Sequence, residues 1–182
     1  MAMTKLERMI QLADEFFSAK SDPNQISVTP EEMEQLRRIH PATMMEQDEG
    51  DGPVAWVLVF PTTEKLMKRF IAKEINEDEL LKMTLLRQTE YGAAGDKGGG
   101  QADGTYEAIY LCSALVLPEF RSRGIAKRLL CEAVKAIQED HPIRHLFYWA
   151  FSDEGEKLAE AVSRETKIPL YRKSLAAKSQ RH

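Results

Sequence analysis

Cysteine and long apolar runs are both scarce in this chain, and each scarcity excludes a class of protein. The 182 residues include only two cysteines, Cys112 and Cys131, too few for a disulfide framework or a cysteine-based zinc site. The longest apolar run, Val54 to Phe60, is far shorter than the ~18–20 residues that a membrane-spanning helix needs. We therefore expect a cytoplasmic protein with no membrane partner.

An excess of positive charge is also missing. The formal net charge is −4, from 25 Lys and Arg against 29 Asp and Glu, whereas proteins that bind nucleic acid through its phosphates carry a strongly basic surface. The first ten residues mix acidic and basic side chains and hold no apolar stretch of the kind found in signal peptides. The sequence thus predicts no nucleic-acid partner and no signal peptide.

What the chain does contain is the composition of a single globular domain spanning residues 1–182. Apolar residues make up 43% and charged residues 30%, both near the averages for globular proteins. Apolar spacing predicts a helix over 4–19, and a capping box that starts at Thr29 predicts a second helix that ends at His40. Further segments follow in order: an acidic loop over 46–53, an inner strand over 54–60, and helices over 63–73 and 77–88, with Asn76 and Glu79 as a second capping pair.

Glycine is concentrated in one segment. Residues 92–104 hold six of the ten glycines and include Gly95-Asp96-Lys97-Gly98. A phosphate-binding P-loop needs a Gly-Lys-Ser/Thr sequence that opens a helix, but this lysine is followed by three glycines. We interpret the segment as a surface loop.

The second half of the chain alternates strands and helices. Strands are predicted over 106–117, 145–151 and 168–172, and amphipathic helices over 122–139 and 153–165, the latter with Asp153 and Glu156 as a capping pair. This order is typical of parallel strands joined by crossover helices. We predict an α/β fold whose core spans 106–172 and is preceded by N-terminal helices within 1–45.

The junction between the first of these strands and its helix predicts an anion site. The strand ends at Pro118, and Gly124 lies where the helix begins, among Arg121, Arg123 and Lys127. The first N–H groups of a helix lack partners within the helix and favour an anion, and a glycine lets a phosphate approach closely. Arginines add charge-assisted hydrogen bonds.

These residues resemble the acyl-CoA loop of the GNAT (N-acetyltransferase) superfamily, Arg/Gln-x-x-Gly-x-Gly/Ala after a strand that ends in Val-x-Pro. Here Val116-Leu117-Pro118 precedes Arg121-Ser122-Arg123-Gly124-Ile125-Ala126. The resemblance implies a central mixed sheet flanked by helices, in which the strand at 106–117 and the strand at 145–151 are a splayed parallel pair. It also implies transfer of an acetyl group from acetyl-CoA to a small-molecule or peptide amine by direct attack, with no metal. The residues that would bind CoA are Leu115, Val116, Leu117, Arg121, Ser122, Arg123, Gly124, Ile125, Ala126, Lys127 and Ser152.

Catalytic groups are harder to assign, because the chain departs from that family twice. Cys112 stands where many relatives carry a glutamate, and the usual tyrosine of the last helix has no counterpart in 153–165. Tyr110 shares a strand face with Cys112 and is our candidate for a polar active-site group, with simple packing as the alternative. We expect the thiol of Cys112 to have a raised pKa and to form no acyl-enzyme, because burial disfavours a thiolate.

Several alternatives stay open from the sequence. The two departures are compatible with an inactive acyl-CoA-binding sensor or interaction module. Tyr148 and Trp149 fit either the core or a cofactor-facing position, and Ser152 fits either a helix cap or a cofactor contact. The sequence also leaves a homodimer open.

Overall fold

The computed structural model describes residues 3–18, 28–92, 104–150 and 152–174. Its helices are α1 (Lys5–Ser18), α2 (Pro30–Ile39), α3 (Glu64–Ile71), α4 (Glu77–Gly92), α5 (Ile125–Asp140) and α6 (Asp153–Thr166). Its strands are β1 (Met44–Asp48), β2 (Pro53–Thr62), β3 (Ala108–Val116), β4 (His145–Trp149) and β5 (Leu170–Lys173). Two short 3-10 turns, η1 (Pro41–Thr43) and η2 (Pro118–Phe120), precede β1 and follow β3. Most of the glycine-rich segment, 93–103, lies outside the described residues.

The strands form one mixed sheet in the order β1-β2-β3-β4-β5. The first two pairings are antiparallel, and β3 with β4 and β4 with β5 pair in parallel. Helices α5 and α6 are the crossovers between the parallel strands, as the alternation of strands and helices predicted. The predicted α/β class, with a mixed sheet flanked by helices, is confirmed.

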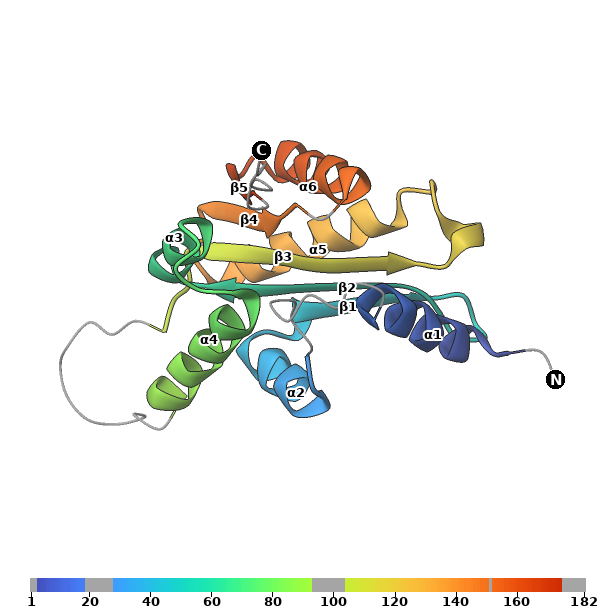
Figure 1. Cartoon of the computed structure of the whole chain (residues 1–182), viewed down its shortest axis with the longest axis horizontal. Helices are drawn as coiled ribbons and strands as arrows, with labels where there is room; N and C mark the ends of the chain where they lie inside the picture. The colour runs from blue at the N-terminus through green and yellow to red at the C-terminus, as the bar shows by residue number, and fades with distance from the viewer. Residues whose placement is uncertain (1–2, 19–27, 93–103, 151, 175–182) are drawn as a thin grey trace, which may run out of the picture.

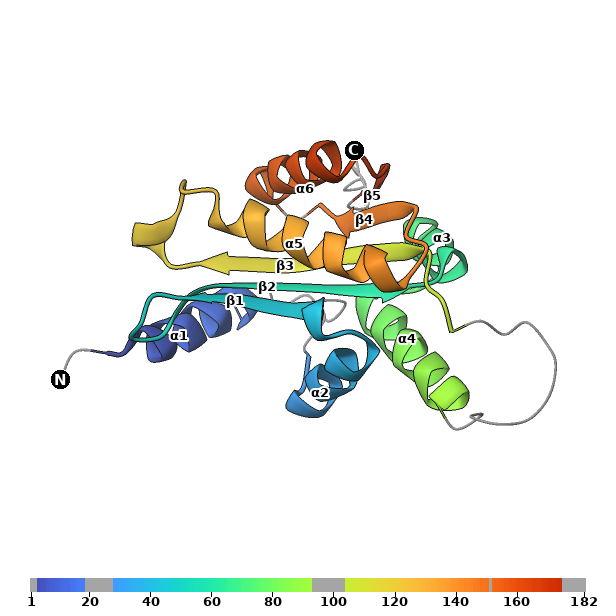
Figure 2. The ribbon, with the colours of Figure 1, turned by 180° about the vertical axis from the view of Figure 1, so that it is seen from behind.

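Helices cover both faces of the sheet (Figures 1 and 2). Helices α5 and α6 pack on one face, where Leu130, Val134 and Val162 meet the sheet residue Ile109 in the largest core cluster. On the other face, α2, α3 and α4 bury a second cluster that includes Phe60, Phe70, Tyr110 and Phe147. Helix α1 lies on this second face too, over a smaller cluster made by Met9, Val54, Leu115 and Leu117.

Capping side chains set the starts of several helices, as their sequence signals predicted. Thr29 and Glu32 form the expected capping box of α2, and Asn76 and Glu79 exchange hydrogen bonds at the start of α4. The expected pair Asp153 and Glu156 is wrong for α6. Its cap is Ser152, as the alternative reading of that residue predicted, and its Oγ accepts a hydrogen bond of 3.1 Å from the N–H of Gly155. The helix begins one residue earlier than the pair Asp153 and Glu156 requires.

The acidic loop predicted over 46–53 is partly wrong, since Met44–Asp48 is a strand. It pairs antiparallel with β2, Met45 opposite Val57 and Gln47 opposite Ala55. The segment is polar because β1 lies at the edge of the sheet and buries little of its surface. Its backbone hydrogen bonds are made with β2. The local sequence of residues 44–48 does not predict this pairing.

A bulge at Cys112 changes which face of the sheet the end of β3 presents. Leu58 pairs with Ser113 and Val59 with Leu111, so Cys112 is an extra residue on β3. Before the bulge, Leu111 packs toward α5, and after it Ala114 and Val116 do the same. Strict alternation would have placed Ala114 and Val116 on the face of Tyr110 and Cys112.

Among the described residues, none of the helices combines the length and the apolar character needed to cross a lipid bilayer.

Candidate functional site

The turn between β3 and α5 has the geometry of an anion-binding loop. We call residues 118–124 the basic turn. Ser122 and Gly124 both adopt left-handed backbone conformations, with φ of 60° and 73°, and Gly124 is the residue that immediately precedes α5. A Cβ at Gly124 would point into open space, with no heavy atom within 4 Å. The backbone at Gly124 is therefore open on the side where a side chain would project.

Two arginines of the basic turn are oriented by backbone carbonyls. Nε of Arg121 donates to the carbonyl of Val116 at 3.1 Å, and a guanidinium nitrogen of Arg123 donates to the carbonyl of Glu119 at 2.8 Å. Arg123 also stacks on Phe120, 4.9 Å from the ring centroid. A guanidinium carries five N–H donors, so these contacts leave donors for a phosphate.

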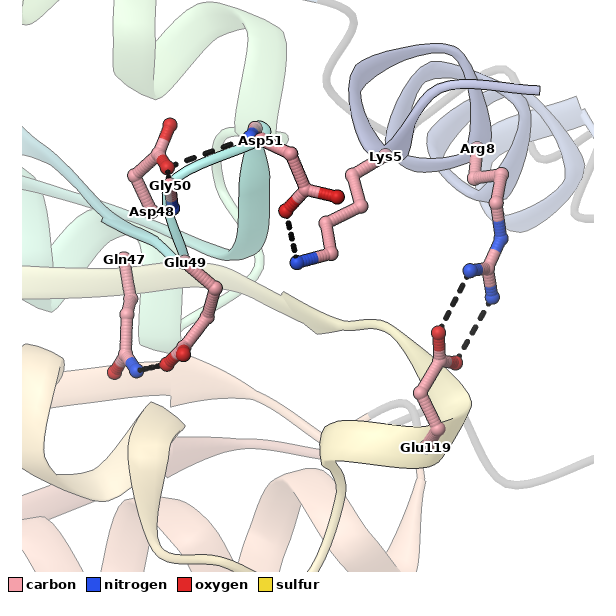
Figure 3. Close-up of polar contacts among 9 residues, drawn as sticks. Lys5, Arg8, Gln47, Asp48, Glu49, Gly50, Asp51 and Glu119 are labelled. Atoms are coloured by element: carbon pink, nitrogen blue, oxygen red, sulfur yellow. Dashed lines mark hydrogen bonds and ion pairs between the residues drawn. The ribbon is translucent and has the colours of Figure 1, made fainter. Parts of the chain in front are cut away.

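Helix α1 supports the basic turn from the other end of the chain (Figure 3). Arg8 forms a bidentate pair with Glu119 at 2.7 and 2.9 Å, and Lys5 contacts Asp51 in the turn between β1 and β2. The hydrogen bonds from Arg8 lower the pKa of Glu119, so this carboxylate stays ionised beside the arginines of the turn.

Next to the basic turn, β3 and β4 diverge. Their ladder consists of three residue pairs, from Ala108–His145 to Tyr110–Phe147, although β3 continues to Val116 and β4 to Trp149. On its other side β3 stays paired with β2 as far as Val116. One backbone edge of 112–116 therefore faces the gap between the two strands.

A cleft of about 550 Å³ occupies this gap. Its walls are residues 111–116 of β3 and Tyr148 and Trp149 of β4. Arg121 of the basic turn lines the cleft, as does Ser152 at the start of α6. The volume is in the range of ordinary small-molecule sites.

The cleft reaches helices on both faces of the sheet. Ala126 and Leu130 of α5 and Leu158 of α6 line it on one face, while Leu12 of α1 and Glu77 of α4 line it on the other. Tyr148 packs in the core on the α5 side and Trp149 against the core on the α4 side. Two molecules that enter from opposite faces could therefore meet between the strands.

Glu77 is the buried acidic group of the cleft. Its side chain is 2% exposed, and it accepts a hydrogen bond from the hydroxyl of Tyr110. Burial, and next the negative charge of Glu77, raise the pKa of the Tyr110 hydroxyl well above its usual range. The same two causes, in the same order, raise the pKa of the Cys112 thiol. Both groups hold their protons at neutral pH, as expected for Cys112.

Sequence reasoning missed Glu77 because a carboxylate in the first turn of a helix has an ordinary explanation. It lies between the capping residues Asn76 and Glu79, where the helix dipole favours negative charge. Its neighbours Asp78 and Glu79 are partly or fully exposed. The only hint in the sequence was the apolar residue Ile75 two positions before Glu77. The burial of both residues became evident only from the packing of α4.

The structure brings some of the predicted site residues together and places others outside the cleft. Cys112, Leu115, Val116, Arg121, Ala126 and Ser152 line it. Tyr110 is 1% exposed and does not line the cleft, but its hydroxyl donates to Glu77, which does. Leu117 is buried, and its N–H donates to the carbonyl of Val54 at 2.9 Å. Five of the predicted residues belong to the basic turn or the start of α5 without lining the cleft: Ser122, Arg123, Gly124, Ile125 and Lys127.

Within the described part of the chain, the acidic, histidine and cysteine side chains form no group of three that could hold a metal ion. No protein-family profile, no curated protein and no solved structure matches this chain.

Proposed function

We propose that this protein is an acyl-CoA-dependent N-acyltransferase that transfers an acetyl group from acetyl-CoA to an amine. The observation that carries the proposal is the divergence of the parallel strands β3 and β4 into a cleft that also contacts the basic turn. The order of these parts is similar to that in GNAT acyltransferases.

In this proposal, CoA lies along β3 and ends at the basic turn. The N–H groups that open α5, together with Arg121 and Arg123, hold the pyrophosphate. The pantetheine arm pairs with the backbone edge of 112–116 that β4 leaves open. The thioester then lies in the cleft near the bulge at Cys112, and backbone N–H groups of the bulged strand stabilise the oxyanion.

Glu77 takes the proton of the attacking amine. An amine with a pKa near ~10 is unprotonated in only ~1 in 10³ molecules at neutral pH, and a general base contributes roughly 10²–10⁴ in rate. The ammonium gives one proton to Glu77, which passes it to solvent. The nitrogen then attacks the thioester carbonyl, the C–S bond breaks, and the CoA thiolate takes up the second proton.

Tyr110 is a positioning residue in this scheme. Its hydroxyl donates to the carboxyl group of Glu77 and helps to hold that group at the cleft. The aromatic side chains of Phe60, Phe70 and Phe147 pack around its ring, with centroids 5.0 to 5.3 Å away, so the hydroxyl has little freedom to move.

An acyl-CoA-binding module without transferase activity is the second candidate. Tyr110 and Cys112, the two catalytic candidates from the sequence, favour this alternative. Tyr110 is buried, and the raised pKa of each group keeps it protonated at neutral pH. Release of thiol from acetyl-CoA in the presence of a panel of amines identifies the enzyme. Calorimetric binding of CoA without thiol release identifies the module.

Substitution of Gly124 tests CoA binding at the basic turn. Gly124→Glu places bulk and negative charge where the pyrophosphate is proposed to lie, so we expect the affinity for CoA to fall by about tenfold or more. Gly50→Glu is the matched control, because Gly50 also has a positive φ, 89°, and open space around its Cβ position. Equal calorimetric affinities for CoA in the two folded variants would contradict the assignment.

A further inference from the structure

A second hollow, of about 620 Å³, lies at the end of β3 opposite the basic turn (Figure 1). We call it the basic pocket. Four parts of the chain build it: the start of α3, the second half of α4, and the residues just before β3 and β4. It shares no lining residue with the cleft between β3 and β4. The residues that line it are Thr63, Glu64, Lys65, Lys68, Arg69, Arg87, Glu107 and Arg144.

Positive charge prevails in the basic pocket, although the chain as a whole is acidic. Five of its lining residues are lysines or arginines and two are glutamates, whereas the chain has a formal net charge of −4. A further carboxylate, Glu74, lies 3.4 Å from Nε of Arg69. Even with Glu74 included and Arg87 left aside, the cations outnumber the carboxylates. This excess favours an anionic ligand.

Glu64 orients two of the cations. One of its carboxylate oxygens is 2.7 Å from Nζ of Lys68, and the other is 3.7 Å from a terminal nitrogen of Arg144 and 3.5 Å from Nε2 of His145. The hydrogen bond from Lys68, and next its charge, lower the pKa of Glu64, so this carboxylate stays ionised.

Lys68 and Arg144 keep donors for a ligand despite these ion pairs. Their side chains are 70% and 65% exposed, and an ammonium has three N–H donors and a guanidinium five. Lys65 is exposed too, and its ammonium has no ion-pair or hydrogen-bond partner within the described part of the chain. Side chains supply this recognition, because the N–H of Glu64 at the start of α3 already donates to Glu107 at 3.2 Å.

We propose that the basic pocket binds the phosphate group of a small polar molecule. A phosphate monoester carries about −1.5 to −2 charges at pH 7 and three acceptor oxygens, which suits three cations on separate side chains. Lys65, Lys68 and Arg144 supply these cations. None of the described residues that line the pocket is aliphatic or aromatic, the residue types that bind a hydrocarbon chain or a base. The proposal is independent of the proposed acyltransferase activity.

The binding experiment compares ligands that differ in charge. Glucose 6-phosphate, glucuronate and glucose are titrated calorimetrically, at constant ionic strength near neutral pH, into the full chain and into Gly124→Glu, in which the basic turn is blocked. We expect glucose 6-phosphate to bind about tenfold more tightly than the other two, the value of one hydrogen bond to a charged group, and equally well to both proteins. Equal affinities for the three ligands, or loss of phosphate binding in Gly124→Glu, would overturn the proposal.

Matched variants assign the binding to the pocket. Arg144→Gln should weaken glucose 6-phosphate binding by about tenfold. Arg38→Gln is the control and should change nothing, because Arg38 is similarly exposed, 69%, and similarly paired, 3.6 Å from Glu34, but does not line the pocket. Lys65→Gln should also weaken binding, and it disturbs no ion pair of the described chain. Unchanged affinity in Lys65→Gln and Arg144→Gln would contradict the proposal, as would binding of hexaglutamate in place of glucose 6-phosphate, which would indicate an acidic protein partner.

Failure of this proposal is separable from failure of the proposed function. Binding of glucose 6-phosphate that depends on Arg144, without thiol release from acetyl-CoA, would support the phosphate site and contradict the transferase. Thiol release in a protein that does not bind glucose 6-phosphate would support the transferase and overturn the phosphate site.

Discussion

Cys112 illustrates how position controls the chemistry of a single residue. It lies in the bulge of β3, lines the cleft, and has a thiol whose pKa is raised by burial and by Glu77. A nucleophilic cysteine needs the opposite shift, toward the thiolate. The same thiol in contact with a lysine or a helix N-terminus would have been a candidate for an acyl-enzyme.

We therefore expect Cys112→Ala to retain activity to within about tenfold of the parent, because the thiol takes no part in bond formation. The parent protein, incubated with acetyl-CoA alone, should show no stable gain of one acetyl group by intact-mass spectrometry. An added acetyl group that disappears in Cys112→Ala would establish a covalent intermediate on this residue.

The raised pKa of Cys112 also predicts a pH dependence of stability. In the unfolded chain this thiol loses its proton near pH ~8.5, whereas the folded protein keeps it, so its contribution is complete below that pH and is lost as the pH rises toward the folded-state pKa. Above about pH 8.5 the free energy of unfolding should fall by up to about 1.4 kcal/mol per pH unit because of this group.

Urea unfolding at several pH values measures this effect, with Cys112→Ala as the comparison. The alkaline decrease in stability should be shallower in Cys112→Ala than in the parent. Tyr110, whose pKa is also raised, adds a decrease only above about pH 10 and does so in both proteins. Identical slopes between about pH 8 and 10 would show that the folded thiol is not shifted.

At the scale of elements, the start of α6 combines a structural and a proposed binding role. Ser152 caps the helix through Gly155 and also lines the cleft. Its oxygen accepts the capping bond, while its hydroxyl hydrogen can still be donated to another group. A cap and a ligand contact are therefore compatible in the same side chain.

Ser152→Ala should lower the free energy of unfolding by about 1 kcal/mol, the usual value of an N-cap, and weaken CoA binding by about threefold. Thr29→Ala is the control, because Thr29 caps α2 in the same way and does not line the cleft. It should show the stability loss alone. A loss of stability in Ser152→Ala without any change in CoA affinity would assign Ser152 to capping only.

At the scale of the whole molecule, the first helix and the basic turn hold each other in place. Arg8 and Glu119 are 111 residues apart in the sequence and form a bidentate pair, with both side chains about two-fifths exposed (Figure 3). Leu12 of the same helix lines the cleft. The pair thus connects one wall of the cleft to the turn proposed to bind phosphate.

A double-mutant cycle measures this connection. Arg8→Ala, Glu119→Ala and the double variant should give a small but measurable coupling energy of about 0.2 to 1 kcal/mol in the free energy of unfolding, because exposed ion pairs are screened by solvent. The coupling in CoA affinity, measured on the same variants, should be of similar size. Additive effects in both measurements would mean that α1 does not support the basic turn.

Much of the fold could be predicted from the sequence because its signals are local. Capping residues at Thr29 and Asn76 lie within three residues of the groups they bond, and the alternation of strands and helices after residue 105 predicted the parallel pairing. The strand β1 was missed because it is defined by backbone pairing with β2, and its own sequence shows no alternation of apolar and polar residues. The pair Asp153 and Glu156 placed the start of α6 one residue too far along, whereas the alternative that Ser152 caps this helix is confirmed.

The sequence by itself determined the basic turn, since a strand end, a proline, a glycine and a helix start act over a few consecutive residues. Only the tertiary structure determined where the cleft lies and which acidic residue is buried in it. Glu77 and Tyr110 are separated by 33 residues, and they meet because α4 packs on the face of β3 that carries Tyr110. The end of the β3–β4 ladder likewise depends on the whole sheet. Contacts between distant segments decide which carboxylate is buried, and burial is what separates Glu77 from its exposed neighbour Glu79.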